Sequence, residues 1–482
     1  MIKKTITSDL FWPLACGLLI IASAAHAVAQ NPTFTTQTHP FLGNNHIAAD
    51  LNGDGKLDLA GTGANAASVM LNKGDGTFQP KIDYPVVGQV QDLAAGDFNG
   101  DGKTDLVVTI NTPQNSLSLL TGNGNGTFNA AVNFPNTSGF DSPSIVATDL
   151  NNDGKLDVVI AHQIACYTAP CIAARTISAL LGNGNGTFQP TREIDVGTGM
   201  SRIAVGDFNR DGKKDLAICG SQAQLFTLIG AGDGTFVQQP TITLVGGNTL
   251  GVDGTDVDVS DLNGDTLQDL VVALGVDGSL TAILIGNGDG SFRAPSLITE
   301  PNLRYPVYQA VADYNGDGKQ DLALGLGWGL QGLMEILNGN GDGTFQSPVL
   351  YLVPPPNSSI AGGTLVAADF NGDGKSDIAL QVVGASPALD VLINATGAPA
   401  LDTVSITRAE YIASKSSLNV EATSSRSTAV LQVFVTSSGQ LIGTLSNNGG
   451  RFSGKFNWAP NPQNITVRSS FGGTATKAVK LK

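Results

Sequence analysis

The sequence predicts an all-β protein: a seven-bladed β-propeller with calcium-binding loops, followed by a small C-terminal β-sandwich. A nine-residue pattern, Asp-x-Asn-x-Asp-Gly-x-x-Asp, occurs seven times at intervals of 47 to 58 residues, with Thr266 in place of the glycine in the fifth copy. Short apolar or β-branched segments flank the copies, and a glycine-rich turn recurs between them. Repetition at such a period indicates one supersecondary unit copied along the chain.

Residues 1–27 are predicted to be a signal peptide. Lys3 and Lys4 precede an apolar stretch, and Ala25-His26-Ala27 places small residues where a signal peptidase reads them; cleavage after Ala29 is the alternative. The apolar run is shorter than the roughly 18 residues of a membrane span. We therefore expect a secreted, extracellular protein with no transmembrane segment in the mature chain, and the periplasm and the cell surface remain alternatives.

Composition points to cations as partners. The chain has 482 residues and a net charge of -15, and the seven copies contain 21 of its 41 acidic residues. A nucleic-acid partner is not expected, because binding phosphates requires clustered Lys and Arg. Cys166 and Cys171 share one short loop and are expected to form a disulfide in an exported chain, whereas Cys219 lies in an apolar run and is expected to be a buried thiol.

Each repeat is interpreted as four antiparallel strands. Segments such as Ile203-Ala204-Val205 precede an acidic loop, and segments such as 106–110 follow it. A third strand, for example residues 117–120, leads into a glycine turn such as Gly122–Phe128, and its Thr-Phe pair is expected to open the fourth strand. Seven such units describe a propeller over residues 31–396.

The two ends of the repeat region predict a closed ring. The seventh unit has a third strand at residues 391–394 but no Gly-Thr-Phe segment after it, and Pro32-Thr33-Phe34 stands at the other end with no third strand before it. Residues 33–42 are therefore expected to supply the missing outer strand of the last blade, which leaves no free sheet edge between the first and last units.

The acidic loops are predicted to bind calcium. Positions 1, 3, 5 and 9 offer side-chain oxygens, position 7 offers its main-chain carbonyl, and glycine at position 6 permits the sharp turn. The predicted ligands, for up to seven Ca²⁺, are Asp50, Asn52, Asp54, Lys56, Asp58, Asp97, Asn99, Asp101, Lys103, Asp105, Asp149, Asn151, Asp153, Lys155, Asp157, Asp207, Asn209, Asp211, Lys213, Asp215, Asp261, Asn263, Asp265, Leu267, Asp269, Asp313, Asn315, Asp317, Lys319, Asp321, Asp369, Asn371, Asp373, Lys375 and Asp377.

The alternative is that these loops are turns without an ion. Two unit charges about 4 Å apart repel by roughly 4 kcal/mol near a protein surface, so three converging carboxylates are costly without a cation. Magnesium is less suitable because it prefers tight octahedral sites with several waters. The twelfth position, which is Glu in an EF-hand, is mostly apolar here, so each loop is expected to run into a strand.

The acidic pattern, paired with glycine turns such as Gly286-Asn287-Gly288-Asp289-Gly290, resembles the FG-GAP and VCBS repeats. The seven-copy arrangement over residues 31–396 is similar to the N-terminal propeller of integrin α-subunits. The resemblance implies calcium in the loops and partner proteins on the opposite face. A loop in every blade makes the chain more similar to bacterial secreted members than to integrins.

A second domain is expected after a linker at residues 397–400. Residues 401–482 contain alternating runs, including 418–421, 430–435, 451–456 and 465–468, separated by Ser, Asn and Gly turns. Strands at this spacing predict a small β-sandwich, similar to immunoglobulin-like modules but without their cysteine pair.

The sequence favours a binding or adhesion module over an enzyme. The mature chain has only three histidines, at 39, 46 and 162, and contains no nucleophile elbow or phosphate-binding Gly-Lys-Ser/Thr. A calcium-dependent carbohydrate-active enzyme such as a polysaccharide lyase is the alternative, and a purely structural surface protein is third. A protein or glycan ligand is expected on the face opposite the calcium loops, near segments 162–175, 301–306, 325–332 and 354–356.

Overall fold

The computed structural model describes residues 31–111, 116–135, 141–163, 176–197, 200–246, 253–275, 280–299, 305–327, 333–353, 360, 363–383, 387–396, 403–424, 429–448, 451–469 and 474–482. The predicted signal peptide (1–27), the linker (397–400) and the predicted disulfide between Cys166 and Cys171 lie outside these residues. Cys219 is a buried free thiol, as expected.

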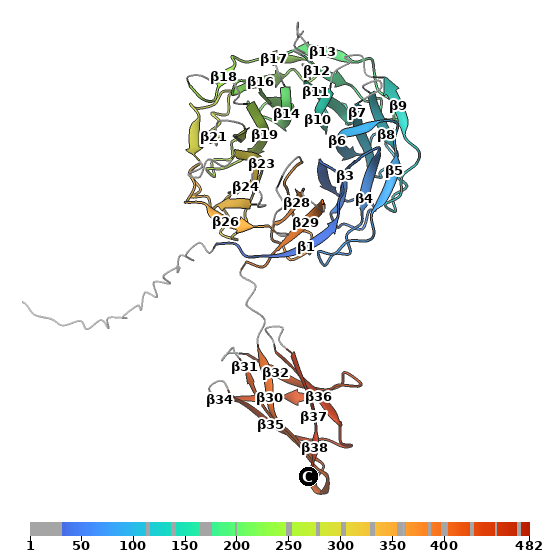
Figure 1. Ribbon diagram of the computed structural model, residues 1–482, viewed down its shortest axis with the longest axis vertical. Helices are drawn as coiled ribbons and strands as arrows, with labels where there is room; N and C mark the ends of the chain where they lie inside the picture. Colours follow the sequence, from blue (N-terminus) through green and yellow to red (C-terminus); the bar gives the residue numbers. More distant parts are fainter. Residues whose placement is uncertain are drawn as a thin grey trace, which may run out of the picture.

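Seven antiparallel sheets of four strands, one of them with a short additional strand, surround a common axis (Figure 1). We number these blades by their acidic loops. The innermost strands are β2 (His46–Ala49), β6 (Gln89–Gly96), β10 (Asp141–Thr148), β14 (Met200–Gly206), β19 (Asp253–Ser260), β23 (Tyr305–Ala312) and β27 (Val366–Ala368). The second strands are β3 (Asp58–Gly63), β7 (Asp105–Asn111), β11 (Asp157–Gln163), β15 (Asp215–Gly220), β20 (Asp269–Gly275), β24 (Asp321–Gly327) and β28 (Asp377–Val382).

The outer half of each blade is formed by the third and fourth strands. The third strands are β4 (Ala66–Met70), β8 (Ser116–Leu120), β12 (Thr176–Leu180), β16 (Gln224–Gly230), β21 (Leu280–Leu284), β25 (Leu333–Leu337) and β29 (Ala388–Asn394). The fourth strands are β5 (Ile82–Pro85), β9 (Val132–Pro135), β13 (Arg192–Asp195), β17 (Phe236–Gln238), β22 (Ser296–Thr299), β26 (Val349–Leu352) and β1 (Phe34–Pro40), and β18 (Ile242–Thr243) also pairs with β16.

The ring closes as predicted. Strand β1, from the start of the described chain, pairs antiparallel with β29 over its full length, from Phe34 opposite Asn394 to Pro40 opposite Ala388. The seventh blade therefore has the order β1-β29-β28-β27, with its outermost strand supplied from the other end of the repeat region. Two hydrogen bonds fasten this junction: Ala395 N–H donates to the Thr33 carbonyl, and Thr33 N–H donates to Thr396 Oγ1.

The core of the ring is divided into seven clusters, one between each pair of neighbouring blades. The cluster that joins blades seven and one contains Leu59 and Met70 on one side and Phe370 and Val391 on the other. Six similar clusters join the remaining pairs. Because each blade buries apolar side chains against both neighbours, the hydrophobic contribution to stability depends on the ring being complete.

The glycine turns differ from expectation at the fourth strand. We expected the Thr-Phe pair to open that strand, but in five blades the Phe forms only an isolated bridge, as Phe78 does with Asn72, and the regular strand starts later. A strand begins at this Phe in the other two blades, at Phe236 in the fourth and at Phe34 in the seventh. The Phe is drawn inward because its ring packs between blades: the Phe78 ring lies 5.7 Å from that of Phe370 in the seventh acidic loop.

The C-terminal region contains two sheets around one hydrophobic cluster. Their orders are β34-β35-β31-β30-β38 and β33-β32-β36-β37. The strands are β30 (Val404–Ile412), β31 (Ser417–Ser424), β32 (Leu431–Val435), β33 (Leu441–Thr444), β34 (Ser446–Asn448), β35 (Arg451–Asn457), β36 (Asn464–Ser469), β37 (Thr474–Ala478) and β38 (Lys480–Leu481). Both sheets contribute to the cluster, for example with Leu418 and Val433. The relation to immunoglobulin-like modules stays a prediction.

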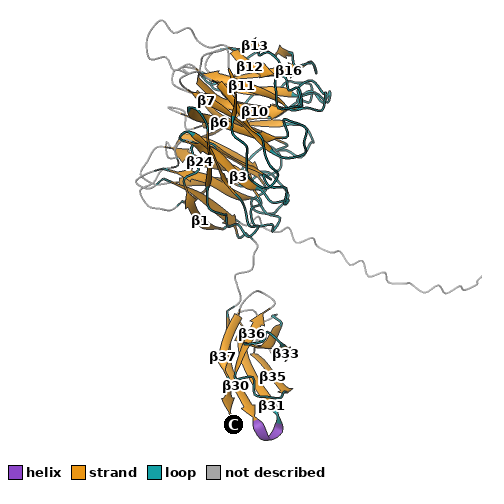
Figure 2. Cartoon of the chain, turned by 90° about the vertical axis from the view of Figure 1, so that its right-hand side faces the viewer, coloured by secondary structure: helices purple, strands orange, loops and turns teal. Residues whose placement is uncertain are grey.

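The described residues contain one helical turn, Ala413–Lys415, coloured purple in Figure 2. Among them, none forms a helix of the length and apolar character needed to cross a membrane.

Removal of the closing strand should destabilise the whole ring. A chain that starts at residue 42 loses the β1–β29 ladder and exposes an unpaired edge. We expect a lower melting temperature and a concentration-dependent shift to oligomers, compared with a chain that starts at residue 31. Thermal unfolding and size-exclusion chromatography measure both effects, and equal melting temperatures for the two chains would contradict the closure mechanism.

Candidate functional site

The seven acidic loops share one backbone conformation. Each connects the first strand of a blade to the second through eight residues, and in every blade the second strand begins at the ninth position of the motif. Positions 4 and 6 adopt positive φ in all seven loops, for example 76° at Gly53 and 80° at Gly55. Position 4 is not always glycine, since Asn152 and Arg210 take φ of 57° and 59° there.

The carboxylate at position 1 organises the turn. In the first loop, Asp50 Oδ1 accepts hydrogen bonds from the main-chain amides of Gly53 and Asp54, at 2.7 and 3.2 Å, and Oδ2 accepts one from Gly55 at 2.8 Å. Asn52 Oδ1 accepts from Asp54 N–H at 2.8 Å. The loop is therefore wound around the side-chain oxygens of positions 1 and 3.

Position 9 has a structural role that we did not predict from the sequence. Asp58 is fully buried; its Oδ2 accepts a hydrogen bond from Leu51 N–H and its Oδ1 accepts one from Asn72 N–H at the end of the third strand. The same pair of bonds occurs in the other six blades. This carboxylate thus fastens the acidic loop to the third strand.

The carboxylates of one loop lie close enough to repel each other. Burial raises the pKa of Asp58 to about 6, the main-chain amides of Asn72 and Leu51 oppose the rise, and the charges of Asp54 and Asp50 add to it. Burial likewise raises the pKa of the ninth residue in five of the other loops, and repulsion from positions 1 and 5 adds to the rise. A bound cation would relieve this repulsion.

The donor set of a loop fits a hard cation in its chemistry, because it consists of carboxylate, amide and main-chain oxygens. Positions 1, 3 and 5 and the carbonyl of position 7 would hold Ca²⁺, and the ninth carboxylate would add charge while it keeps its structural bonds. Across the described ranges, no three His, Cys, Asp or Glu side chains converge closely enough to form a metal centre by themselves. The predicted ligand set therefore stays a prediction.

The acidic loops and the glycine turns lie on the same face of the ring, as predicted. Within the third blade, the aliphatic stem of Lys155 lies over Gly184, where a Cβ would approach it to 2.8 Å. Between blades, Gly186 N–H donates to the Phe98 carbonyl of the preceding acidic loop at 2.9 Å, and three other blade junctions have the equivalent bond. Acidic loops and glycine turns are thus linked across four blade junctions of this face.

A family profile for the FG-GAP-like repeat matches residues 50–108, 97–160, 171–218, 207–272, 261–324 and 313–380. Together these matches cover more than half of the chain. The chain belongs to the FG-GAP-like repeat family. A comparison with curated proteins returned no match.

Two solved structures are similar to the FG-GAP chain in fold comparisons. The crystal structure of BBS1N in complex with ARL6DN, soaked with lead, has 13% identity and a TM-score of 0.48, and the match covers 76% of this chain and 97% of that one. The core factor of S. cerevisiae has 9% identity and a TM-score of 0.46, with 76% and 62% of the two chains covered.

The fifth FG-GAP loop keeps the path of the other six despite Thr266. Its φ of 68° is left-handed, and its main-chain amide still donates to Asp261 Oδ2 at 2.8 Å. Asp265 N–H also makes the bonds to Asp261 and Asn263 that its counterparts make elsewhere. The substitution therefore does not change the path of the loop, and Thr266 is held in a left-handed conformation that is unfavourable for a β-branched residue.

The axis of the FG-GAP ring contains a set of polar side chains that the sequence analysis missed. One residue, five positions before each acidic motif, comes from every blade: Asn45, Asp92, Ser144, Arg202, Asp256, Tyr308 and Thr364. We call this set the axial polar ring. Five of its members occupy the same register position, opposite the fifth residue of the second strand, as Asp92 does with Thr109.

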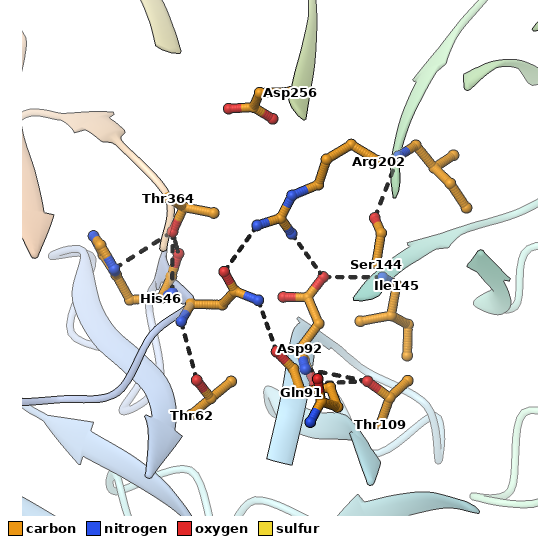
Figure 3. A network of polar contacts seen from close by, with 12 residues as sticks. His46, Thr62, Gln91, Asp92, Thr109, Ser144, Ile145, Arg202, Asp256 and Thr364 are labelled. Carbon is orange, nitrogen blue, oxygen red and sulfur yellow. Dashed lines mark hydrogen bonds and ion pairs between the residues drawn. The ribbon is translucent and has the colours of Figure 1, made fainter. Parts of the chain in front are cut away.

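Members of the axial polar ring bind the inner edge of the following blade. Asp92 Oδ2 accepts a hydrogen bond from Ile145 N–H at 3.0 Å, Ser144 Oγ accepts one from Ile203 N–H, and Asp256 Oδ2 accepts one from Gln309 N–H. Thr364 Oγ1 accepts the bond from His46 N–H that joins the seventh blade to the first (Figure 3). These bonds satisfy main-chain amides on innermost strands that have no further strand to pair with.

Arg202 connects distant blades through the axial polar ring. Its guanidinium pairs with Asp92 of the second blade at 3.2 Å and donates to Asn45 Oδ1 of the first blade at 2.8 Å (Figure 3). Burial raises the pKa of Asp92 to about 6, and the Arg202 charge limits the rise. Burial opposes the charge on Arg202, but Asp92 and Asp256 raise its pKa above the usual value. The pair is therefore ionised at neutral pH.

The predicted ligand-face segments are only partly described. His162 was expected near a recognition loop, but it is buried within the third blade, where its Nε2 lies 2.6 Å from Ser178 Oγ. Burial lowers the pKa of His162 to about 4, so it is neutral at physiological pH. Residues 164–175, 301–304, 328–332 and 354–356 lie outside the described ranges.

Substitution Arg202→Met should destabilise the ring strongly, by about 3–5 kcal/mol, because Asp92 is left buried with its charge uncompensated. The double variant Arg202→Met/Asp92→Asn should recover part of the loss. Arg408→Met removes an exposed arginine and two surface ion pairs, and should change little. Denaturant unfolding of the four proteins tests the coupling; equal losses at Arg202 and Arg408 would contradict it.

Substitution Thr266→Gly should stabilise the fifth loop. Left-handed backbone costs a β-branched residue about 1–2 kcal/mol, and greater freedom of glycine in the unfolded chain offsets part of the gain. We expect a higher melting temperature in chelator and about tenfold tighter calcium binding at this loop if the strain falls on the bound state. Gly102→Thr, the reverse change at the equivalent position of the second loop, should have the opposite effects. No change in either variant would contradict the strain.

Proposed function

We propose that this protein is an exported, calcium-stabilised β-propeller that acts as a protein- or glycan-binding, adhesion-type module. The ligand would bind the face formed by the second turns of the blades and the links between blades. The other face has a structural role in this proposal, since hydrogen bonds join its acidic loops and glycine turns at four blade junctions. In this proposal, the predicted signal peptide directs export, and the protein is released from the cell; the periplasm and the cell surface are the alternative locations.

The observation that carries the proposal is a contrast in loop length between the two faces. The acidic connection contains eight residues in all seven blades, whereas the second turns contain between two residues in the first blade and twelve in the third. A uniform face supports a repeated structural role, and variable loops on a rigid scaffold are where proteins usually place recognition.

Described contacts support the assignment of second turns and links to one face. In the first blade, Val86 N–H in the link donates to the carbonyl of Asn65 in the second turn. In the fourth blade, Leu244 N–H donates to the Ala223 carbonyl in the same manner. In these two blades the second turn thus supports the link that leaves the blade, and Val87, next to Val86, is 68% exposed.

A binding screen with an activity assay tests the proposed function. The chain from residue 31 is applied, with calcium, to glycan and extracellular-protein arrays, and polysaccharides are assayed for released products. Binding without turnover is expected. Product release would instead support the alternative, a polysaccharide lyase. If neither binding nor turnover were detected, the third alternative, a purely structural surface protein, would be supported.

Matched variants then locate the ligand on the ring. Val87→Arg and Gln222→Arg add charge and bulk to exposed positions on the second-turn face, and Gln79→Arg and Gln189→Arg do the same beside glycine turns. Only the first pair should weaken binding. Loss of binding in the second pair alone would place the ligand on the wrong face for this proposal.

Calcium removal should destabilise the propeller. Twenty-one carboxylates in seven loops repel one another when no cation is bound, and a ligand that binds only the native state adds about 2.7 kcal/mol at a concentration of 100 times its Kd. Excess chelator at low salt should therefore lower the melting temperature, and added Ca²⁺ should restore it better than Mg²⁺. An unchanged melting curve, with metal analysis confirming depletion, would contradict calcium as a folding cofactor.

A further inference from the structure

We propose that the C-terminal region carries a second binding site, for neutral carbohydrate, at one end of its two sheets. A hollow of about 630 Å³ opens there between the turn after β32 and the segment that joins β35 to β36. Its size lies within the roughly 300–1,000 Å³ of small-ligand sites. The site is independent of the ligand proposed for the propeller.

The lining of this hollow excludes most ligand classes. None of its lining side chains is charged, and its principal polar groups are the amides of Gln440, Asn457, Asn461 and Gln463. Carboxylate or phosphate ligands would find no cation to pair with, and cationic ligands would find no anion. A purely apolar ligand would bury these amides without partners, which is costly. A neutral ligand with many hydroxyl groups fits.

The amide side chains match hydroxyl groups in their bonding capacity. A side-chain amide can both donate and accept hydrogen bonds, as a sugar hydroxyl can. One side chain can therefore donate to one hydroxyl and accept from the adjacent one. Gln440, Asn457 and Gln463 are exposed, and their side chains make no hydrogen bond within the described part of the chain. These groups are available to a ligand.

Trp458 supplies the apolar surface that a sugar ring requires. It lies in the lining and is half-buried, since part of its side chain packs against the hydrophobic cluster between the two sheets. The face of an indole ring carries partial negative charge and is attracted to the polarised C–H groups on one side of a pyranose. A tryptophan anchored on one side and surrounded by amides provides stacking and hydrogen bonding together.

The main chain around the hollow is held in place before any ligand binds. Val435 N–H donates to the Gln440 carbonyl, and Thr436 N–H donates to the Asn464 carbonyl, which joins the two lining segments. Gln463 has a φ of 60°, an uncommon conformation that two main-chain hydrogen bonds stabilise. Its main-chain N–H donates to Asn461 Oδ1, and its main-chain carbonyl accepts from Val479 N–H. Such preorganisation lowers the cost of binding.

The test uses the chain from residue 31 and four soluble neutral hexasaccharides: cellohexaose, maltohexaose, mannohexaose and xylohexaose. Calorimetric titration with each should detect binding of at least one. Trp458→Ala should weaken it at least tenfold, because tryptophan is enriched among the residues whose truncation costs the most binding energy. The double variant Asn457→Ala/Gln440→Ala, which changes only exposed amides, should also weaken it with an unchanged melting temperature.

Asn464→Ala is the matched control, because this exposed amide lies next to the hollow but does not line it. It should bind as the parent chain does. Three results would overturn the proposal: no binding of any of the four sugars, binding that neither the Trp458 nor the double variant reduces, or binding of anionic polygalacturonate in preference to all four. The amide variant keeps the test decisive if Trp458→Ala is unstable.

Discussion

The buried carboxylate at the ninth position of each acidic loop is the interaction on which the propeller depends. It accepts one hydrogen bond from a main-chain amide at the start of its own loop and one from a main-chain amide at the end of the third strand. It therefore fixes the connection between the inner and outer halves of a blade. Hydrogen bonds to a charged group contribute about 1.5–3 kcal/mol each. Since the second strand begins at this residue in every blade, the same contact also sets where the strand starts. A repeat that lost it would leave two buried amides unsatisfied as well as a loop without an anchor.

The geometry of single blades does not by itself make a ring. Neighbouring blades must also be joined, and polar contacts join them both on the loop face and at the axis. On the loop face, main-chain bonds from the glycine turns reach the preceding acidic loops, as Gly186 does with Phe98. At the axis, four side chains of the axial polar ring accept hydrogen bonds from main-chain amides of the next innermost strand. Arg202 cannot accept such a bond, and instead it crosses to Asp92 and Asn45. The axis is thus closed by polar contacts, while the apolar clusters hold the blades together farther out.

Much of this architecture could be predicted from the sequence because it is encoded by repetition. The seven motifs predicted seven blades, and the unmatched segments at the two ends predicted the pairing of β1 with β29. Strand alternation predicted that the acidic loops and the glycine turns lie on one face. The fourth strand was misplaced because the packing of Phe78 between blades, a tertiary effect, competes with local strand propensity. The ninth carboxylate was considered as a ligand because spacing gives no information on burial. The axial polar ring had a signal, a polar residue five positions before every motif, but its meaning depends on seven distant strands meeting at one axis.

The difference in loop length between the two faces follows from the same constraints. An acidic connection must place its first carboxylate beneath three main-chain amides and its ninth carboxylate between loop and strand, so neither its length nor its turn positions are free to vary. Thr266 shows how strict this is: the fifth loop keeps the common path and tolerates left-handed backbone at a β-branched residue. The second turns, in contrast, differ several-fold in length. The constant length of the acidic connections thus follows from the contacts of the first and ninth carboxylates, and the ligand proposed for this propeller is assigned to the second-turn face because of this contrast in length.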